Sequence, residues 1–231
     1  PPGGRVVIVD DPVAFAARHG ASGAIVAGTY DGALSNDGER IALLAADLDP
    51  IKDFTYNDVE PWPVAADGDG YSLVLIDPGA NPDHNDPASW RSSVAVGGSP
   101  GDKDSAPFAG EPEADADGDR QSAFLEYATG SSDGDSTSFT STVSSIESFD
   151  IDGQADTYVV FEFPVNLAAE GVSYRIQAAP NLEGWEDVTD EFTYLSTSNY
   201  GDGTAIVRYR SNSPFRPGDA PRSFLRLAVS G

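Results

Sequence analysis

The amino-acid sequence predicts an all-β protein with two β domains joined by a short loop–helix connector. Short apolar runs broken by Gly, Pro, Asn and Asp dominate the chain, and helical periodicity is scarce. Several segments, most clearly residues 172–177, alternate apolar and polar side chains. Such alternation indicates antiparallel sheets with one buried and one wet face, most simply a sandwich. We place the first domain at residues 1–96, the connector at 97–135 and the second domain at 136–231.

In the first domain, a buried strand and a short helix are expected to open the fold. Residues 5–9 are Arg-Val-Val-Ile-Val, an apolar run that needs cover on both faces, and Pro12 begins a helix expected at 12–18. The turns at 35–38 and 67–70 carry Asn, Asp and Gly, which tolerate a positive φ angle. Further strands are predicted at 24–27, 40–44, 51–56 and 71–76.

The connector and the second domain differ in composition. Residues 97–114 are rich in Gly, Pro and Asp, which predicts a flexible linker. Residues 129–145 are rich in Ser, Thr and Asp and are expected to form either an exposed edge or a poorly ordered segment. Trp185 is expected to cover one end of the second core. Strands are predicted at 156–163, 172–177, 192–195, 204–209 and 223–229.

Within the connector, residues 115–126 have the ligand spacing of an EF-hand calcium loop. Oxygen-bearing side chains occupy positions 1, 3, 5 and 12, and the residue at position 7 offers its backbone carbonyl. Aspartates at alternate positions converge only if the loop curls around a cation, because like charges at short range repel each other. We therefore predict a structural calcium ion bound by Asp115, Asp117, Asp119, the carbonyl of Gln121 and Glu126.

A short helix at 122–129, ended by Gly130, is expected to present both oxygens of Glu126 to the ion. Position 6 of the loop is normally a glycine with a positive φ angle, but here it is Arg120, at a strain of roughly 1 kcal/mol. Asp133 and Asp135, just past the helix, are candidates for the same site or for a second cation. The alternative for the whole segment is a solvated acidic linker without metal.

The composition is strongly acidic and excludes several classes of partner. The formal net charge is −25 at pH 7, so nucleic acids and anionic membranes would be repelled, and no apolar run approaches a membrane span. The absence of cysteine excludes disulfides, thiolate zinc sites and cysteine nucleophiles. Methionine is absent even from position 1, which predicts a processed or excised piece of a longer protein. We expect no nucleic-acid partner and no membrane insertion.

A set of motifs in the first domain has a characteristic order and spacing. They are Gly28-Thr-Tyr-Asp-Gly-Ala-Leu34, Ser35-Asn-Asp-Gly-Glu-Arg-Ile41-Ala-Leu43, Asp53-Phe-Thr-Tyr56, Pro61-Trp-Pro63 and Gly70-Tyr-Ser-Leu73. Together they resemble the second half of the bacterial lamin tail domain, an immunoglobulin-like β-sandwich. The resemblance implies a non-catalytic interaction module of secreted or cell-surface proteins, often beside a spore-coat-kinase-like domain.

Two later segments resemble parts of large bacterial exoproteins. The acidic loop followed by Phe124-Leu-Glu-Tyr127 is similar to the calcium-loop connectors found near their C-termini. The last part of the chain, with Tyr174-Arg-Ile-Gln177 and Trp185, resembles the β-sandwich that ends such proteins. These resemblances imply a secreted or cell-surface location.

The first domain departs from the lamin tail pattern at its beginning. Several strands of that pattern precede the segment that here starts at Pro1. A sandwich without them exposes sheet edges and half of its core, a condition that proteins generally avoid. We therefore expect the upstream part of the same precursor, or another copy of the chain, to supply equivalent strands by β-strand addition.

Catalytic constellations are weak in this sequence. Of the two histidines, His84 lies in a turn rich in Asn, Asp and Pro, and His19 ends the expected first helix. No Gly-x-Ser-x-Gly elbow and no phosphate-binding loop is present. We predict a non-enzymatic extracellular module for adhesion or assembly. The alternative is a carbohydrate-binding accessory module of a secreted polysaccharide-degrading enzyme, with Trp62, Trp90 or Trp185 as stacking platforms rather than core residues.

Overall fold

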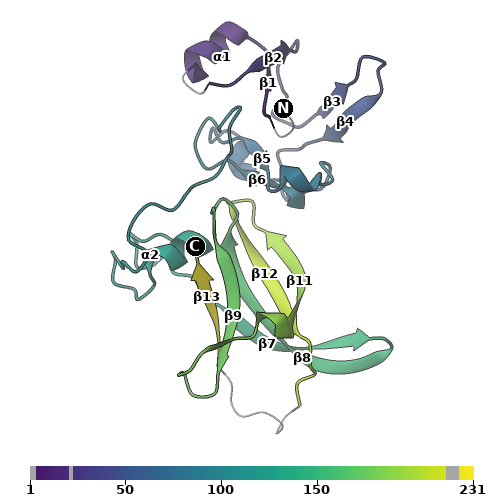
Figure 1. The fold of residues 1–231 in the computed structure, drawn as a ribbon. Helices are drawn as coiled ribbons and strands as arrows, with labels where there is room; N and C mark the ends of the chain where they lie inside the picture. Colours follow the sequence, from purple (N-terminus) through teal and green to yellow (C-terminus); the bar gives the residue numbers. More distant parts are fainter. Residues whose placement is uncertain (1–3, 21–22, 217–223) are drawn as a thin grey trace. The chain divides into compact units, whose positions relative to one another are not determined.

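The computed structural model describes residues 4–20, 23–216 and 224–231, and it confirms the all-β class (Figure 1). Two α-helices are found in the described part of the chain, α1 (Pro12–His19) and α2 (Ala123–Thr129). The chain divides into two compact units. Unit 1 comprises Pro1–Ala106 with Tyr200–Gly203, and unit 2 comprises Pro107–Asn199 with Thr204–Gly231.

Unit 1 is built from three two-stranded sheets among its described residues. One is parallel, β1 (Val7–Val9) with β2 (Val26–Thr29). The other two are antiparallel: β3 (Arg40–Leu44) with β4 (Pro50–Thr55), and β5 (Leu73–Leu75) with β6 (Trp90–Ser92). Single turns of 3₁₀ helix lie at Val64–Ala66, Pro78–Ala80 and Pro87–Ser89. Every strand in a two-stranded sheet has one edge without a strand partner.

The core of unit 1 is small and aromatic. Trp62 and Trp90 are each 8% exposed, and their ring centroids are 6.1 Å apart. The ring of Phe54 on β4 packs 5.5 Å from Trp90, and the imidazole of His84 lies 5.2 Å from Phe54. Trp62 and Trp90 are therefore core residues and not exposed platforms for stacking on sugars. His84 is a turn residue whose ring covers this cluster.

Many large apolar side chains of unit 1 remain exposed. The buried hydrophobic residues among those described are Val9, Trp62 and Trp90. The exposed ones are Val6, Ile8, Val13, Ile25, Val26, Tyr30, Leu34, Leu43, Leu44, Leu48, Ile51, Val59, Val64, Val94 and Val96. Unit 1 thus presents an extensive apolar surface beside short sheets with open edges.

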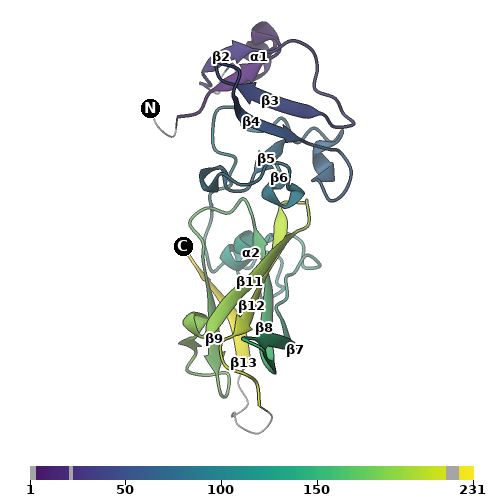
Figure 2. The same cartoon turned by 90° about the vertical axis from the view of Figure 1, so that its right-hand side faces the viewer.

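Unit 2 is a sandwich of two antiparallel sheets (Figures 1 and 2). The four-stranded sheet has the order β11 (Phe192–Asn199), β12 (Thr204–Ser211), β8 (Gln154–Asn166) and β7 (Val143–Ile151). The three-stranded sheet has the order β10 (Glu186–Asp187), β9 (Ser173–Ala179) and β13 (Phe224–Ser230). A 3₁₀ turn at Thr189–Glu191 leads into β11.

The core of unit 2 lies between these two sheets. It contains Phe161, Phe163 and Val165 from β8, together with Ile176 from β9 and Ala205 from β12. Leu225 and Leu227 of β13 pack against it from the second sheet. The alternation in this part of the sequence agrees with the structure, because Tyr174 and Ile176 are half-buried and buried whereas Ser173 and Arg175 are exposed.

The sequence-based expectations differ from the structure at several points. Residues 97–106 belong to unit 1 and residues 107–135 to unit 2, so the predicted connector is divided between two packed units. The strands β6 and β7 were not expected. Trp185 is half-buried, and the guanidinium of Arg226 stacks over its ring at 4.3 Å, so it lies outside the core cluster. Position 223, the first of the last predicted strand, lies outside the described residues.

Candidate functional site

The acidic loop brings its first three carboxylates together. One oxygen from each of Asp115, Asp117 and Asp119 lies within 4.8 Å of the others. Twice a calcium–oxygen distance of about 2.4 Å is about 4.8 Å, so these oxygens fit around a single ion. The predicted convergence of the alternate aspartates is what the structure shows.

Backbone N–H groups within the loop fix the orientation of these side chains. Asp115 accepts from Gly118 at 2.8 Å through Oδ1 and from Arg120 at 3.1 Å through Oδ2. Oδ1 of Asp117 accepts from the N–H of Asp119 at 3.1 Å. These contacts curl the chain so that the acidic side chains turn inward. Arg120 has a φ angle of +79°, which is the left-handed conformation expected at position 6 of the loop.

Glu126, the last residue of the motif, is the most unusual group of the site. It lies on α2, its exposed fraction is 0%, and neither carboxylate oxygen has a hydrogen-bond partner among the described residues. Oδ2 of Asp117 is also buried without a partner. A buried carboxylate without partners is costly, because its charge loses water and gains nothing in exchange.

Like charges surround Glu126 as well. Burial raises the pKa of Glu126, and the charges of Asp117, Asp119 and Asp133 raise it further, while the Ser131 hydroxyl acts in the opposite direction. The charges of the loop therefore act on the buried carboxylate of α2. Among the described residues, the close group of three does not include Glu126, so ligation by Glu126 requires the loop to close around the ion.

The two aspartates beyond the helix occupy different surroundings. Asp133 is half-buried, and its Oδ1 accepts from the N–H of Ala116 at 2.9 Å, which ties it to the start of the loop. Asp135 is exposed, and its Oδ1 accepts from the N–H and the hydroxyl of Thr137 at 3.0 and 2.7 Å. Those two hydrogen bonds lower the pKa of Asp135. The structure thus brings Asp133, and not Asp135, to the acidic loop.

Gln121 connects the loop to the segment that follows the helix. Its N–H donates to Oδ1 of Asp119 at 2.7 Å, and its side-chain oxygen accepts from the hydroxyl of Thr140 at 2.9 Å. That hydroxyl lies 3.0 Å from Oγ1 of Thr129, which in turn donates to the carbonyl of Leu125. The side-chain oxygen of Gln121 therefore has a structural hydrogen bond. Ligation of calcium by the backbone carbonyl of Gln121 stays a prediction.

Helix α2 is fastened to the sandwich of unit 2 through its last turn. The side-chain amide of Asn166 on β8 donates to the carbonyl of Tyr127 at 2.9 Å, and the hydroxyl of Tyr174 on β9 donates to the carbonyl of Ala128 at 2.7 Å. Burial raises the pKa of Tyr174 to about 12, so this hydroxyl remains a donor at neutral pH. Gly130 ends the helix with a φ angle of +88°, and a Cβ there would lie 2.7 Å from Cγ2 of Thr204.

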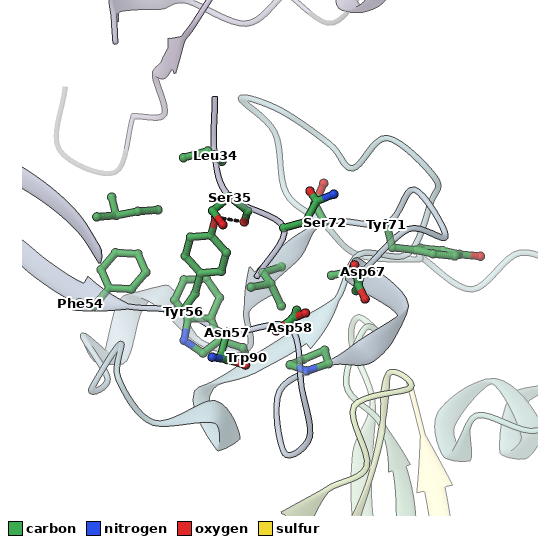
Figure 3. A pocket seen from close by; sticks show the side chains of 15 residues that line it. Leu34, Ser35, Phe54, Tyr56, Asn57, Asp58, Asp67, Tyr71, Ser72 and Trp90 are labelled. Carbon is green, nitrogen blue, oxygen red and sulfur yellow. Dashed lines mark hydrogen bonds between the residues drawn. The ribbon is translucent and has the colours of Figure 1, made fainter. Parts of the chain in front are cut away.

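Unit 1 contains a separate pocket of about 390 Å³ (Figure 3). Its aromatic lining is Phe54, Tyr56, Tyr71 and Trp90, and its polar lining is Ser35, Asn36, Asn57, Asp58, Asp67 and Ser72. The hydroxyl of Tyr56 donates to the carbonyl of Ser35 at 2.6 Å, so it is used within the wall. The size falls in the range of about 300–1,000 Å³ typical of small-molecule sites.

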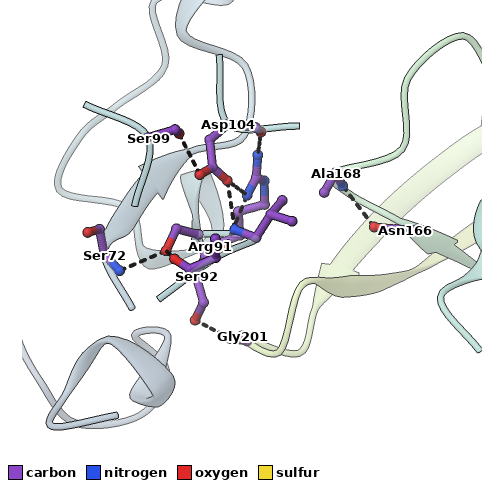
Figure 4. Close-up of polar contacts among 11 residues, drawn as sticks. Ser72, Arg91, Ser92, Ser99, Asp104, Asn166, Ala168 and Gly201 are labelled. Carbon is purple, nitrogen blue, oxygen red and sulfur yellow. Dashed lines mark hydrogen bonds and ion pairs between the residues drawn. The ribbon is translucent and has the colours of Figure 1, made fainter. Parts of the chain in front are cut away.

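A buried ion pair joins Arg91 of β6 to Asp104 in the same unit (Figure 4). Nη1 of Arg91 is 2.6 Å from Oδ1 of Asp104, and the two side chains are 4% and 6% exposed. Asp104 also accepts from the hydroxyl of Ser99 at 2.7 Å and from the N–H of Val94 at 2.9 Å. Burial acts to raise the pKa of Asp104, but the hydrogen bonds from Arg91, Ser99 and Val94 outweigh burial, so the pKa of Asp104 is lowered. Both oxygens of Asp104 accept hydrogen bonds from protein groups, which indicates a structural role, although Nε of Arg91 is buried without a partner.

Of these features, the acidic loop with Glu126 is the site where buried carboxylate oxygens lack protein partners among the described residues. No family model, curated protein or solved structure matches this chain. Among the described residues, no helix combines the length and the apolar character needed to span a bilayer.

Proposed function

We propose that this chain is a non-catalytic, calcium-binding structural module of an extracellular bacterial protein, used in adhesion or assembly at the cell surface. The observation that carries the proposal is Glu126, which is fully buried, has no hydrogen-bond partner and faces other carboxylates. A bound cation would supply the missing partner of this carboxylate, so that its burial would stabilise the folded protein instead of destabilising it. The lamin-tail resemblance of the first domain supports the same class of protein.

The donor set favours calcium over other common metals. Every candidate side chain offers carboxylate oxygens, and the chain contains no cysteine. Hard cations such as calcium take six to eight oxygen ligands at about 2.3–2.6 Å, whereas magnesium keeps several waters in a strict octahedron. A loop that must close around its ion suits the larger and more tolerant coordination of calcium.

The proposed role of the ion is to hold α2 and its loop on the sandwich. The helix is tied to β8 and β9 through the carbonyls of Tyr127 and Ala128, so a neutralised Glu126 stabilises the whole attachment. Extracellular calcium is abundant, and a dissociation constant of about 10⁻⁴ M would keep the site filled. When the calcium concentration is ten times this dissociation constant, binding adds about 1.4 kcal/mol to the free energy of unfolding.

Calorimetric titration of the metal-free protein with calcium tests this proposal. We expect binding at submillimolar calcium, together with a higher melting temperature and slower proteolysis of residues 107–135. Asp117→Ala should weaken binding strongly, because it removes a charged ligand whose Oδ2 is buried without a partner. Absence of binding at millimolar calcium, or parent-like binding by Asp117→Ala, would overturn the proposal and leave the segment as an acidic linker.

The assembly role is supported by the open edges of unit 1. Its sheets are two-stranded among the described residues, and exposed apolar side chains such as Leu43 on β3 and Ile51 on β4 lie on them. An added strand would satisfy edge N–H and C=O groups and cover this apolar surface. The partner would be an upstream segment of the same precursor or a second copy of the chain.

Sedimentation velocity across a wide concentration range is expected to show self-association at physiological salt, which screens the large negative charge. Ile51→Lys should reduce association, because Ile51 is 57% exposed on β4 and a charge there discourages strand pairing. Leu48→Lys is the matched control, since Leu48 is 74% exposed in the turn before β4. A compact monomer at every concentration, with slow amide exchange throughout residues 5–56, would contradict the assembly role.

The pocket of unit 1 favours carbohydrate binding as the second candidate function. Aromatic rings beside amides and carboxylates are the lining that sugars require, since the rings stack on C–H faces and the polar groups bind hydroxyls (Figure 3). Against it, Trp62 and Trp90 are buried, so they offer no exposed stacking platform. A polysaccharide array separates the two functions: retention on one glycan that Tyr71→Ala abolishes would favour the sugar-binding module.

A further inference from the structure

We infer that Asp133 is a ligand of the same calcium ion and closes its coordination sphere from beyond helix α2. This inference rests on the proposed calcium site and extends it, because the twelve-residue motif ends at Glu126. It also implies that Asp133 and Asp135 do not form a second cation site. The ion would then join three segments: the loop, the helix and the chain that follows the helix.

The first observation is the position of Asp133 against the loop. Its Oδ1 accepts from the N–H of Ala116, which stands between the first two aspartates of the motif. That hydrogen bond uses Oδ1 of Asp133 and not Oδ2. Among the described residues Asp133, like Glu126, lies outside the close group of three, so its ligation also requires the loop to close around the ion. The side chain is half-buried although it belongs to a polar turn. A contact across 17 residues places Asp133 at the entrance of the loop.

The second, independent observation is the state of Glu126. Both of its oxygens are buried without a partner, and the charge of Asp133 acts on it together with those of Asp117 and Asp119. The loop, α2 and the turn after α2 therefore each bring a carboxylate to this part of unit 2. A cation placed among them offsets the repulsion without a proton and supplies the missing partner of Glu126.

The turn after α2 explains how Asp133 reaches this space. The carbonyl of Glu126 accepts from Gly130 at 2.7 Å and from Ser131 at 3.1 Å, so the chain folds back over the residue that carries the buried carboxylate. The left-handed conformation of Gly130 makes that reversal possible. Asp133 follows the reversal directly, whereas Asp135 is turned outward and held by Thr137.

Participation of Asp133 changes the expected selectivity of the site. Asp115, Asp117, Asp119, Glu126 and Asp133 together oppose a divalent ion with excess negative charge. A high count of charged ligands raises affinity for calcium, and irregular ligation from three segments disfavours the octahedral magnesium ion. We therefore expect calcium binding to persist in an excess of magnesium.

Isothermal titration calorimetry of the full chain with calcium chloride tests the inference through Asp133→Asn and Asp135→Asn. Asparagine retains an oxygen that can accept from Ala116, so the variant removes charge and spares the hydrogen bond. We expect one ion per parent chain, a dissociation constant raised about tenfold or more by Asp133→Asn, and no change with Asp135→Asn. Thermal unfolding in chelator verifies that both variants fold.

The outcomes separate this inference from the function on which it rests. Calcium binding by the parent with parent-like affinity in Asp133→Asn would overturn the role of Asp133 and leave the proposed function standing. Two ions per parent chain, one of them lost in Asp135→Asn, would do the same. No calcium binding by the parent would overturn both.

Discussion

Replacing Glu126 with glutamine is expected to stabilise the metal-free protein and to destabilise the protein in calcium. Without calcium, Glu126 is a buried charge without a hydrogen-bond partner that faces other carboxylates, so its removal relieves repulsion and desolvation. With calcium, the same charge is a ligand, and the neutral amide binds a hard cation more weakly. A residue that has only a packing role would not change the stability in opposite directions with and without calcium.

The sizes of the two effects follow from the same contacts. An unsatisfied buried group costs about 1–3 kcal/mol, and glutamine relieves only part of this because its amide also lacks partners. When calcium is at ten times its dissociation constant, the variant loses the contribution of about 1.4 kcal/mol that calcium binding makes to the free energy of unfolding of the parent. Each kcal/mol corresponds to roughly 4 °C in the melting temperature of a unit of this size.

The pH dependence in chelator has a defined sign. The pKa of Glu126 is raised in the folded protein. The stability linked to its protonation is therefore fully present below the ordinary glutamate pKa and is lost as the pH rises through the raised pKa. The advantage of Glu126→Gln in chelator should consequently be largest at pH 8 and shrink toward pH 4.

Differential scanning calorimetry in chelator and in calcium, at pH 8, measures both effects. Glu113→Gln is the matched control, because it makes the same charge change at an exposed residue just before the loop. It should leave both melting temperatures close to those of the parent. If Glu126→Gln shifts the two melting temperatures in the same direction, Glu126 is not a metal ligand.

Asp104→Ala is expected to destabilise unit 1 by about 3–5 kcal/mol, because it leaves the guanidinium of Arg91 buried without its counter-charge. It also removes the acceptor for Ser99 and for the N–H of Val94. The small hydrophobic core of this unit has little reserve with which to offset that loss. Fluorescence of Trp62 and Trp90 during denaturant unfolding reports this transition.

A surface ion pair supplies the control. Arg40 and Asp53 join neighbouring strands at 2.6 Å, but their side chains are 64% and 38% exposed, so Asp53→Ala should change stability little. Arg91→Met combined with Asp104→Leu removes both charges and should cost less than Asp104→Ala alone. Equal effects of Asp104→Ala and Asp53→Ala would show that the buried pair does not hold unit 1 together.

The pH dependence of unit 1 follows from the same pair. The pKa of Asp104 is lowered in the folded protein. Its contribution to stability is therefore present above the ordinary aspartate pKa and is lost as the pH falls toward the lowered pKa. Unit 1 should lose stability in acid through this residue, whereas the metal-free site of unit 2 gains stability there through Glu126.

The parts of the site that depend on local spacing could be predicted from the sequence. Alternate aspartates in a loop, a glutamate in the first turn of the helix that follows and a glycine cap all act over a few residues. The structure accordingly places Asp115, Asp117 and Asp119 together and ends α2 at Gly130. The strand at 40–44 was located for a similar reason, because its apolar run stands between clear turn signals.

The parts that depend on distant contacts could not be predicted in this way. Asp104 lies in a segment with linker composition, and only the fold places it beside Arg91. β7 begins in a Ser- and Thr-rich stretch that has no strong strand propensity of its own, because pairing with the long strand β8 holds it. Trp185 has the apolar bulk of a core residue, but it is covered by Arg226 instead.

Anomalous diffraction from crystals of the protein grown in millimolar calcium tests the proposed calcium site most directly. We expect one calcium peak per chain, at about 2.3–2.6 Å from carboxylate oxygens of the acidic loop and from both oxygens of Glu126. A map without a peak at this position, with Glu126 hydrogen-bonded to protein groups instead, would contradict it.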